Sequence, residues 1–538
     1  MNDKLNGAEA MLTSLVGAGV EVCFANPGTS EMQMVAALDR VDGMRPVLAL
    51  FEGVASGAAD GYGRMADKPA ATVLHMGPGL SNAMANLHNA QRAQTPMVNL
   101  IGDHASAHLQ FDAPLTADIK GQAKTVCHQV KTCKSASNLP HDAIEIVQAA
   151  KTNEGQVCSL IIPANTAWED SASVEVTPIQ FAKKKVPLLR IQAIADILKN
   201  DQCNAMLLGG KALREEGLKA AGRIFKATGT RILNETLPAR RKRGAGVFPT
   251  ETVPYLAEIA IQFLKPFDNI VLAGAKAPVG FFAYPNVPSQ LHSEHTSLPL
   301  LCAIDEDITD ALITLAKILN ATEDADTQPR ITPPAPRNEL CPMGVGAILA
   351  ECMPENTIVV DEANTASLAI HPMTQGAARH DILGLTGGSI GIGLPMALGA
   401  AIACPDRKVI CLEGDGSGMY TPQALWSIAR ENLDVTVVIL KNNSYAILDL
   451  ELQRTGAKVA EGNASKARSL LSLENPTLDW IKLSEGMGVP ATNASTVAQF
   501  RHQFSQAMNT RGPRLIQATL IKVDLAAAMA ELMKLQTP

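Results

Sequence analysis

Two short stretches of the sequence combine residue types that could hold a ligand. A Gly-Asp-Gly motif at residues 414–416 directly follows an apolar run, and an Asn-Asn pair at residues 442–443 ends the next apolar run. A carboxylate and an amide oxygen are ligands that Mg²⁺ accepts, and Mg²⁺ in proteins is commonly shared with phosphate groups. Glycines on either side of Asp415 allow the backbone to approach a ligand closely. The two stretches therefore predict a divalent cation that holds a diphosphate.

The residues around the two stretches predict the elements that must bring them together. Segments 408–413 and 434–440 are rich in β-prone apolar residues, whereas segment 421–433 has apolar residues at helical spacing and a proline near its start. In such a β-α-β unit the two strands are parallel and end at one edge of the sheet, where open α/β folds bind ligands. We therefore expect Asp415 and Asn443 to lie side by side, with backbone N–H groups at the helix start available to a diphosphate.

Two other interpretations of this motif stay open. A dinucleotide-binding turn would have the pattern G-x-G-x-x-G and an acid at the end of the second strand. Here the glycines are Gly414, Gly416 and Gly418, and the second strand ends in amides. A glycine turn with a purely structural role is the other alternative. We favour the metal–diphosphate site, because it accounts for both the carboxylate and the amides.

Strand and helix patterns alternate along the chain, which is typical of parallel sheets covered by helices on both faces. At 538 residues the chain is too long for one hydrophobic core. Polar, proline-containing stretches interrupt the pattern near residues 168–187 and 320–342, and we interpret them as linkers. We predict three α/β domains with doubly wound parallel sheets, at residues 1–170, 188–322 and 342–538.

The composition excludes several classes of protein. A net charge of −7 and a pI of about 5.9 give no bias toward nucleic acids or anionic membranes. The first residues lack the basic and apolar regions of a signal peptide, and no apolar run has the length of a membrane span. Ten cysteines scattered through a long chain indicate reduced thiols rather than a disulfide framework. We expect a cytoplasmic enzyme without nucleic-acid or membrane partners.

The Gly-Asp-Gly-Ser motif, the ALWSIAR segment after it and the Asn-Asn pair together resemble the cofactor motif of thiamine-diphosphate-dependent enzymes. The sequence is most similar to the benzoylformate decarboxylases and more loosely similar to the large subunits of acetolactate synthases. The resemblance covers the whole chain, because the order of the three domains matches. It implies an N-terminal domain that binds the aminopyrimidine, a mainly structural middle domain and a C-terminal domain that binds the diphosphate.

The resemblance implies a set of cofactor contacts in the C-terminal domain. The side chains of Asp415 and Asn443, with the backbone carbonyl of Tyr445, would bind Mg²⁺. Gly388 would offer its carbonyl to the pyrimidine, and Ile390 would support the bent cofactor beneath its two rings. The remaining contacts would come from Asn364, Thr365, Gly414, Gly416 and Ser417.

The same resemblance implies three catalytic residues in the N-terminal domain. Glu52, in FEGVASGAADGYGR, would lie beside the pyrimidine N1′ in a mostly apolar niche that favours its protonated form. Without the motif, an acid at a helix start would be read as complementing the helix dipole. Thr29, in NPGTSE, would direct a hydroxyl toward the substrate. His75, in LHMGPG, would donate to the substrate carboxylate and relay a proton.

The middle domain departs from the decarboxylase pattern at one position. The decarboxylases have a second active-site histidine there, whereas this sequence has Phe281 and Phe282, which hint at a pocket for an apolar or aromatic side chain. A loop expected to border the pocket carries His104, His108 and Asp112, and one of them could replace the missing group.

A nucleotide in the middle domain is a separate question, because acetolactate synthases carry FAD there. Residues 207–217 look like a nucleotide-fold turn, but the later flavin-contacting segments of that family are not recognisable, so we expect no FAD. The basic run Arg240–Arg243 could hold an anionic group, and we interpret it instead as a solvated charged loop.

These observations predict an enzyme that uses thiamine diphosphate and Mg²⁺ to decarboxylate a 2-oxo acid to an aldehyde without oxidation. The alternative is a carboligase of the acetolactate synthase type, which forms a 2-hydroxy ketone. A second alternative is a non-catalytic homologue that only binds the cofactor. In the resembled family Glu52 of one chain would face Asp415 of the partner subunit, so we expect a homodimer as the minimum active unit and a homotetramer as the assembly.

Overall fold

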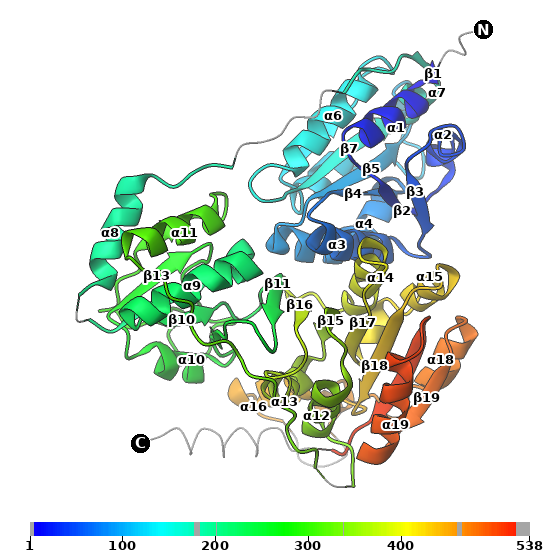
Figure 1. Cartoon of the computed structure of the whole chain (residues 1–538). Coiled ribbons are helices and arrows are strands. Elements are labelled where there is room, and N and C mark those ends of the chain that lie inside the picture. Colours follow the sequence, from blue (N-terminus) through cyan, green and yellow to red (C-terminus); the bar gives the residue numbers. More distant parts are fainter. Residues whose placement is uncertain (1–4, 177–182, 201, 337, 460–464, 523–538) are drawn as a thin grey trace.

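The computed structural model describes residues 5–176, 183–200, 202–336, 338–459 and 465–522 (Figure 1). Three main parallel sheets organise this part of the chain, and hydrophobic cores lie on both faces of each sheet. The prediction of three doubly wound α/β units is therefore confirmed. The exact domain limits stay predictions, and residues 177–182 of the expected first linker lie outside the described residues.

The first unit contains a six-stranded parallel sheet with the order β3-β2-β4-β5-β7-β6. Its strands are β2 (Val22–Asn26), β3 (Arg45–Leu48), β4 (Ala70–Leu74), β5 (Met97–Asp103), β6 (Gln129–Thr132) and β7 (Val157–Pro163), and two further short strands, β1 (Leu5–Asn6) and β8 (Asp170–Ser171), pair with each other. Its helices are α1 (Gly7–Gly17), α2 (Met32–Ala37), α3 (Glu52–Ala66), α4 (Met76–Ala93), α5 (Ile119–Lys124), α6 (Leu139–Ala150) and α7 (Ala164–Trp168), with 3-10 turns at Thr29–Glu31 and Leu109–Phe111.

Local sequence explains how this unit is layered. Asn6 and Glu9 form a capping box that begins α1, with the Glu9 N–H 2.9 Å from Asn6 Oδ1. Successive strand residues face opposite sides of the sheet, so Phe24 lies in the core with α3 and α4, and Cys23 lies in the core with α1 and α6.

The middle unit contains a five-stranded parallel sheet with the order β12-β10-β9-β13-β14. Its strands are β9 (Asn204–Leu208), β10 (Arg231–Asn234), β12 (Glu251–Thr252), β13 (Asn269–Ala273) and β14 (Leu300–Cys302). Its helices are α8 (Leu188–Leu198), α9 (Glu215–Thr228), α10 (Ala257–Leu264) and α11 (Ile308–Ile318), with a 3-10 turn at Gly210–Leu213.

The third unit contains a seven-stranded sheet with the order β11-β16-β15-β17-β18-β20-β19. Its strands are β11 (Arg240–Arg243), β15 (Thr357–Glu362), β16 (His380–Gly384), β17 (Val409–Gly414), β18 (Val435–Lys441), β19 (Ala491–Ala494) and β20 (Arg514–Thr519). Its helices are α12 (Pro342–Cys352), α13 (Ser367–Met373), α14 (Gly393–Ala403), α15 (Ala424–Arg430), α16 (Ala446–Arg454), α17 (Lys466–Ser469), α18 (Trp480–Gly486) and α19 (Val497–Met508), with 3-10 turns at Asn364–Ala366 and Ser417–Tyr420.

The interpretation of Arg240–Arg243 as a solvated loop is wrong. These residues form β11, which leaves the middle unit and pairs antiparallel with β16 at the edge of the third sheet (Figure 1). Arg240 Nε is 2.9 Å from the buried Asp381 carboxylate, which also binds Lys242 and Arg407. Burial alone would raise the pKa of Asp381, but these three cations lower it below its usual range. Arg240 and Lys242 are thus paired with an acid far away in the sequence, whereas Arg241 donates to Asn234 and Thr252.

The first and third units share one hydrophobic core, because α3 packs directly against α14. The two helices approach through glycines: a Cβ atom on Gly399 would lie 1.8 Å from the Ala58 carbonyl oxygen, and one on Gly61 would lie 2.1 Å from the Met396 carbonyl oxygen. Glu52 begins α3, and the loop with Gly388 and Ile390 leads into α14, so this packing positions two predicted parts of the site. None of the helices described here is long and apolar enough to cross a membrane.

Candidate active site

The structure brings Asp415 and Asn443 together at the carboxyl edge of the third sheet. Asp415 directly follows β17, is only 2% exposed, and accepts the backbone N–H of Asn443 at 2.7 Å. Burial raises the pKa of Asp415 to about 6, because the ionised carboxylate has lost most of its contact with water. Asn443 adopts a left-handed conformation, with φ of 58°, where the chain turns out of β18.

The side chains in this turn fit a hard cation. Asn443 Oδ1 is buried and accepts no hydrogen bond from the described residues, so together with the Asp415 carboxylate it offers oxygen ligands of the kind Mg²⁺ takes. The Tyr445 carbonyl, in contrast, already accepts the Leu448 N–H at 2.9 Å at the start of α16. The first amide of the pair, Asn442, which was given no role of its own, accepts the Ser444 N–H through its Oδ1 at 2.9 Å.

The predicted diphosphate loop is crowded around two glycines. A Cβ atom on Gly414 would lie 2.8 Å from Ser417 Oγ, and one on Gly416 would lie 2.5 Å from Tyr445 Cε1. Ser417 is buried, whereas Asn364 is exposed and places its Nδ2 3.5 Å from Ser417 Oγ. The adjoining Thr365 is half-buried. The loop therefore gathers these predicted contacts without room for a side chain at either glycine.

The predicted pyrimidine loop is held by α4 of the first unit. Asn89 accepts the Ser389 N–H and donates to its carbonyl, and Asn86 donates to the Gly391 carbonyl at 3.3 Å. Gly388 has φ of 74°, a left-handed conformation that favours glycine, and Ile390 is half-buried. These hydrogen bonds fix the loop between the first and third units.

Glu52 is the first residue of α3 and is only 5% exposed. Asn82 Nδ2 donates to its Oε2 at 2.9 Å, and a Cβ atom on Gly79 would lie 2.9 Å from its Oε1. This position is compatible with both interpretations of Glu52. The carboxyl lies at a helix N-terminus, as expected for a group that complements the helix dipole, and it also lies in a tight niche formed with α4, as expected for a catalytic acid. A Cβ atom at position 79 would press on this carboxyl group.

His75 lies beside a buried carboxylate that sequence reasoning missed. Its Nδ1 is 2.8 Å from Glu31 Oε2, and Glu31 also accepts the Gly28 N–H at 2.8 Å. A carboxylate at Nδ1 orients the ring and leaves Nε2 as the nitrogen available to a substrate. The hydroxyl nearest His75 is that of Ser30, at 3.3 Å, whereas Thr29 is exposed. The signal was present in the sequence, because Ser30 and Glu31 complete the NPGTSE motif.

The structure places His104, His108 and Asp112 on the loop after β5. The two histidine rings contact each other, with centroids 5.3 Å apart, and Asp112 ends the 3-10 turn in a left-handed conformation. Within the described residues, none of their recorded hydrogen bonds reaches Glu52 or His75. Their part as a replacement for the second histidine stays a prediction.

Phe281 of the middle unit reaches the pyrimidine loop. Its Cζ atom is 2.8 Å from the position of a Cβ atom on Gly388, and its ring packs against Tyr255 and Phe282 at centroid distances of 5.5 and 5.1 Å. Tyr284, three residues later, donates to Glu451 of α16 at 2.6 Å. The aromatic segment is therefore fixed to the third unit at a second point.

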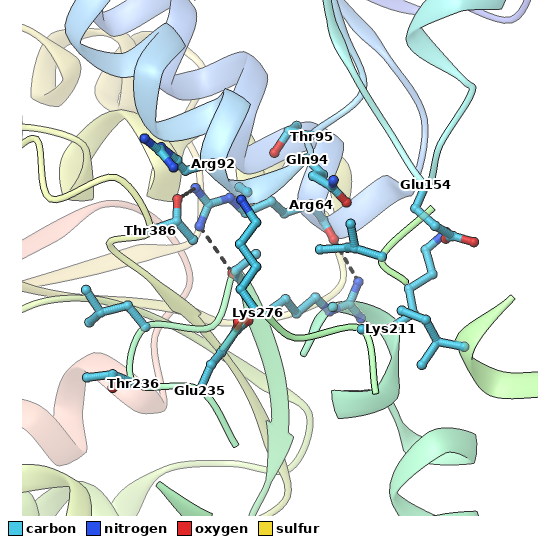
Figure 2. A pocket seen from close by; sticks show the side chains of 18 of the residues that line it. Arg64, Arg92, Gln94, Thr95, Glu154, Lys211, Glu235, Thr236, Lys276 and Thr386 are labelled. Atoms are coloured by element: carbon cyan, nitrogen blue, oxygen red, sulfur yellow. Dashed lines mark hydrogen bonds and ion pairs between the residues drawn. The ribbon is translucent and has the colours of Figure 1, made fainter. Parts of the chain in front are cut away.

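A cavity of about 290 Å³ lies between the first and middle units, at the carboxyl edge of the middle sheet (Figure 2). Its wall carries Arg64, Arg92, Lys211, Arg214, Glu235 and Lys276. Arg64 donates to the Ala239 carbonyl and to Thr386, and burial raises the pKa of Glu235 to about 7. Lys211 and Arg214 belong to the turn at residues 207–217, and Arg240 of the basic run also lines the cavity, but none of the predicted catalytic, metal or thiamine diphosphate contacts does. The expectation that FAD is absent stays a prediction.

Two family models match the chain at its two ends. The thiamine pyrophosphate enzyme N-terminal TPP binding domain matches residues 5–131, and the corresponding C-terminal TPP binding domain matches residues 367–518. One relative is the protein IlvX of Mycobacterium tuberculosis, whose name describes it provisionally as an acetolactate synthase large subunit. It is 47% identical over 96% of this chain and 99% of its own length. The chain belongs to the thiamine pyrophosphate enzymes.

Other relatives of this thiamine pyrophosphate enzyme include decarboxylases. A benzoylformate decarboxylase of Pseudomonas aeruginosa is 26% identical over 93% of this chain and 96% of its own length. The thiamine-diphosphate-dependent 4-hydroxybenzoylformate decarboxylase of Rhodococcus jostii RHA1 has the same fold, with a TM-score of 0.82 and 22% identity over 96% of this chain and all of that chain. The resemblance to the decarboxylase and acetolactate synthase superfamily is thereby confirmed.

Proposed function

We propose that this thiamine pyrophosphate enzyme decarboxylates a 2-oxo acid to an aldehyde without oxidation, and that it uses Mg²⁺. The observation that carries the proposal is His75, oriented by the buried Glu31 at 2.8 Å. Release of an aldehyde requires a proton donor near the substrate, and an oriented histidine can supply it near neutral pH. In the resembled family, decarboxylases have a histidine at this position and acetolactate synthases lack it.

The residues at the edge of the third sheet would hold the cofactor. Asp415 and Asn443, with the Tyr445 carbonyl, would bind Mg²⁺ and through it the diphosphate. Ser417, Asn364 and Thr365, with the glycines at 414 and 416, would contact the diphosphate directly. Gly388 and Ile390 would contact the pyrimidine and support the bent cofactor.

The residues of the first unit would move protons. Thiamine diphosphate, when bound, supplies the carbon nucleophile and accepts the electron pair that CO₂ leaves behind. Glu52 would hold a proton at the pyrimidine N1′, in the niche that Asn82 and Gly79 form around it. His75 would bind the substrate carboxylate and later donate a proton through Nε2, while Thr29 and the neighbouring Ser30 would position the keto acid.

A carboligase of the acetolactate synthase type is the second candidate. It is favoured by the 47% identity to IlvX and by Phe281, which stands where the decarboxylases have a second histidine. A non-catalytic homologue fits less well for two reasons. Glu52 lies in a niche suited to its catalytic role, and Asp415 and Asn443 lie together in a turn suited to a cation. In this turn Asn443 Oδ1 accepts no hydrogen bond from the described residues.

The aromatic segment of the middle unit supports a substrate with an apolar side chain. Phe281 and Phe282 remain 45% and 56% exposed although one of them lies against Gly388. Aromatic residues make up only 4% of this chain, so three clustered rings beside the pyrimidine loop favour a pocket for an apolar or aromatic group.

A homodimer is the smallest active unit that we propose, in a cytoplasmic homotetramer. Apolar side chains are exposed next to both predicted halves of the site: Met32 follows the Thr29–Glu31 turn, Leu50 lies two residues before Glu52, and Met419 and Tyr420 follow Ser417. Exposed apolar groups at both places are consistent with a partner subunit covering them. The test is to dilute the enzyme, measure its oligomeric state by sedimentation and measure its specific activity at the same concentration. A monomer that keeps full specific activity would refute the dimer.

A product screen tests the reaction. The purified chain, with thiamine diphosphate and Mg²⁺, is incubated with aromatic and aliphatic 2-oxo acids, and CO₂, aldehyde and hydroxyketone are measured separately. Aldehyde as the sole organic product supports the decarboxylase. Hydroxyketone as the sole organic product supports the carboligase, and the absence of CO₂ despite intact cofactor binding contradicts both. The absorption spectrum of the same sample tests the expectation that FAD is absent.

A further inference from the structure

Two glutamates lie beneath the cofactor loops and have no part in the predicted site. Glu362 ends β15, Glu413 lies in β17, and the two residues are direct neighbours across these parallel strands. Both side chains are fully buried, and both carboxyl groups approach the position of a Cβ atom on Gly393. Neighbouring residues on parallel strands point to the same face of the sheet, so the two carboxyl groups lie side by side.

Glu362 holds the loop that leads into α14. Its Oε1 accepts the Gly391 N–H at 2.6 Å, and its Oε2 accepts the Gly393 N–H at 2.5 Å. Both oxygens are therefore acceptors, and the carboxylate lies at the N-terminus of α14, where a negative charge is stabilised. Gly388 and Ile390, the predicted pyrimidine contacts, lie in the residues just before these two N–H groups.

Glu413 holds the other cofactor loop. Its Oε1 accepts the hydroxyl of Ser417 at 2.6 Å, and Ser417 is the predicted diphosphate contact. Its Oε2 converges on the Oε2 of Glu362: a Cβ atom on Gly393 would lie 2.2 Å from the first and 2.9 Å from the second. The chain of contacts thus runs from Ser417 through both glutamates to the start of α14.

We propose that Glu362 and Glu413 act as one positioning pair that ties the diphosphate loop to the pyrimidine loop. The pair fixes the position of Ser417 relative to the loop before α14. The diphosphate and the pyrimidine of thiamine diphosphate would therefore both bind to contacts that are already in place. The inference rests on the cofactor site of the family and is independent of which reaction the enzyme catalyses.

The directions of these hydrogen bonds make the two positions unequal. A glutamine at position 413 can still accept from Ser417 through its oxygen and donate to Glu362 through its amide. A glutamine at position 362 cannot replace the carboxylate, because one of its two terminal atoms would turn an N–H group toward a backbone N–H. We therefore expect Glu413→Gln to be tolerated and Glu362→Gln to be damaging, although both changes remove one carboxyl group.

Calorimetric titration of the full-length apoprotein with thiamine diphosphate and Mg²⁺ tests the pair. Glu413→Gln should keep Kd within about twofold of the unmodified protein, whereas Glu362→Gln and Glu413→Leu should raise it about tenfold or more, equivalent to about 1.4 kcal/mol. Equal losses in Glu413→Gln and Glu362→Gln would overturn the proposal, as would an unchanged Kd in Glu362→Gln.

A second probe separates positioning from general stability. Mg²⁺ with inorganic pyrophosphate addresses the diphosphate loop alone, so Glu413→Leu should weaken its binding and Glu413→Gln should restore it. Thermal unfolding of each apoprotein is measured alongside. Variants that lower the melting temperature but bind both probes normally would show a purely structural role and refute the proposal. If Glu362→Gln does not fold, the Glu413→Leu and Glu413→Gln comparison still decides, and all these titrations remain informative if the enzyme proves not to be a decarboxylase.

Discussion

The ring of Phe281 lies against the backbone of Gly388, with its Cζ atom 2.8 Å from the position of a Cβ atom on this glycine. Phe281 belongs to a loop of the middle unit, and Gly388 belongs to the predicted pyrimidine loop of the third unit. The contact gives the middle unit, expected to be mainly structural, a side chain at the candidate active site. It makes Phe281 the residue of the middle unit to test for a part in substrate choice.

Phe281→Ala should change substrate preference rather than abolish activity. Without the Phe281 ring, the aromatic side chain of a bound substrate would lose an apolar contact. One such contact is worth about tenfold in kcat/KM. We expect the ratio of kcat/KM for benzoylformate to that for pyruvate to fall by about this factor. Phe225→Ala is the matched control, since Phe225 is also partly exposed but packs on Phe248 in the middle unit. An unchanged ratio would remove Phe281 from the substrate pocket.

Glu52→Gln should lower turnover while leaving the cofactor bound. The amide keeps the shape of the side chain but cannot exchange a proton with the pyrimidine, and such proton transfers contribute about a hundredfold or more. Steady-state turnover and calorimetric titration of the cofactor measure the two effects separately. Glu355→Gln, on the exposed surface, is the control. Turnover equal to that of the unmodified enzyme would contradict the catalytic assignment of Glu52.

Mg²⁺ affinity should fall as the pH decreases through about 6. Burial raises the pKa of Asp415 in the metal-free protein to about 6, and a protonated carboxyl does not bind the cation. Above this pH the carboxylate is already ionised, so the affinity should level off. Titrations of Mg²⁺ at several pH values measure the effect, and Asp415→Asn should show weak affinity with the inflection removed. An inflection that persists in the variant would assign the titration to another group.

Gly399→Ala should destabilise the fold. Its Cβ atom would lie 1.8 Å from the Ala58 carbonyl oxygen, so α14 and α3 would have to separate, at a cost of about 1–3 kcal/mol in the free energy of unfolding. Urea denaturation measures the change. Gly486→Ala is the control, because a Cβ atom on this helical glycine meets nothing within 4 Å. Equal stability of the two variants would show that the helices adjust without cost.

Local patterns in the sequence were enough to place the main elements of the site. Apolar runs that stop at Gly-Asp-Gly and Asn-Asn predicted strand ends, and parallel strands place such ends at one edge, which is where Asp415 and Asn443 meet. Glu52 is the first residue of helix α3. This position could also be predicted, because the alternation of strand, turn and helix depends on residues close together in the sequence. The fold class followed from repetition of that alternation.

Contacts between distant segments could not be obtained in this way. The approach of Glu362 to Glu413, the packing of the Phe281 ring on Gly388 and the pairing of β11 with β16 each join parts of the chain that have no shared local pattern. A run such as Arg240–Arg243 is highly charged by composition, and its place in a strand at the sheet edge depends on partners such as the buried Asp381, which pairs with Arg240 and Lys242. Periodicity and turn chemistry act over a few residues, so they specify elements and cofactor motifs. Which buried acid meets which cation, and which ring covers which loop, depends on how the three units pack.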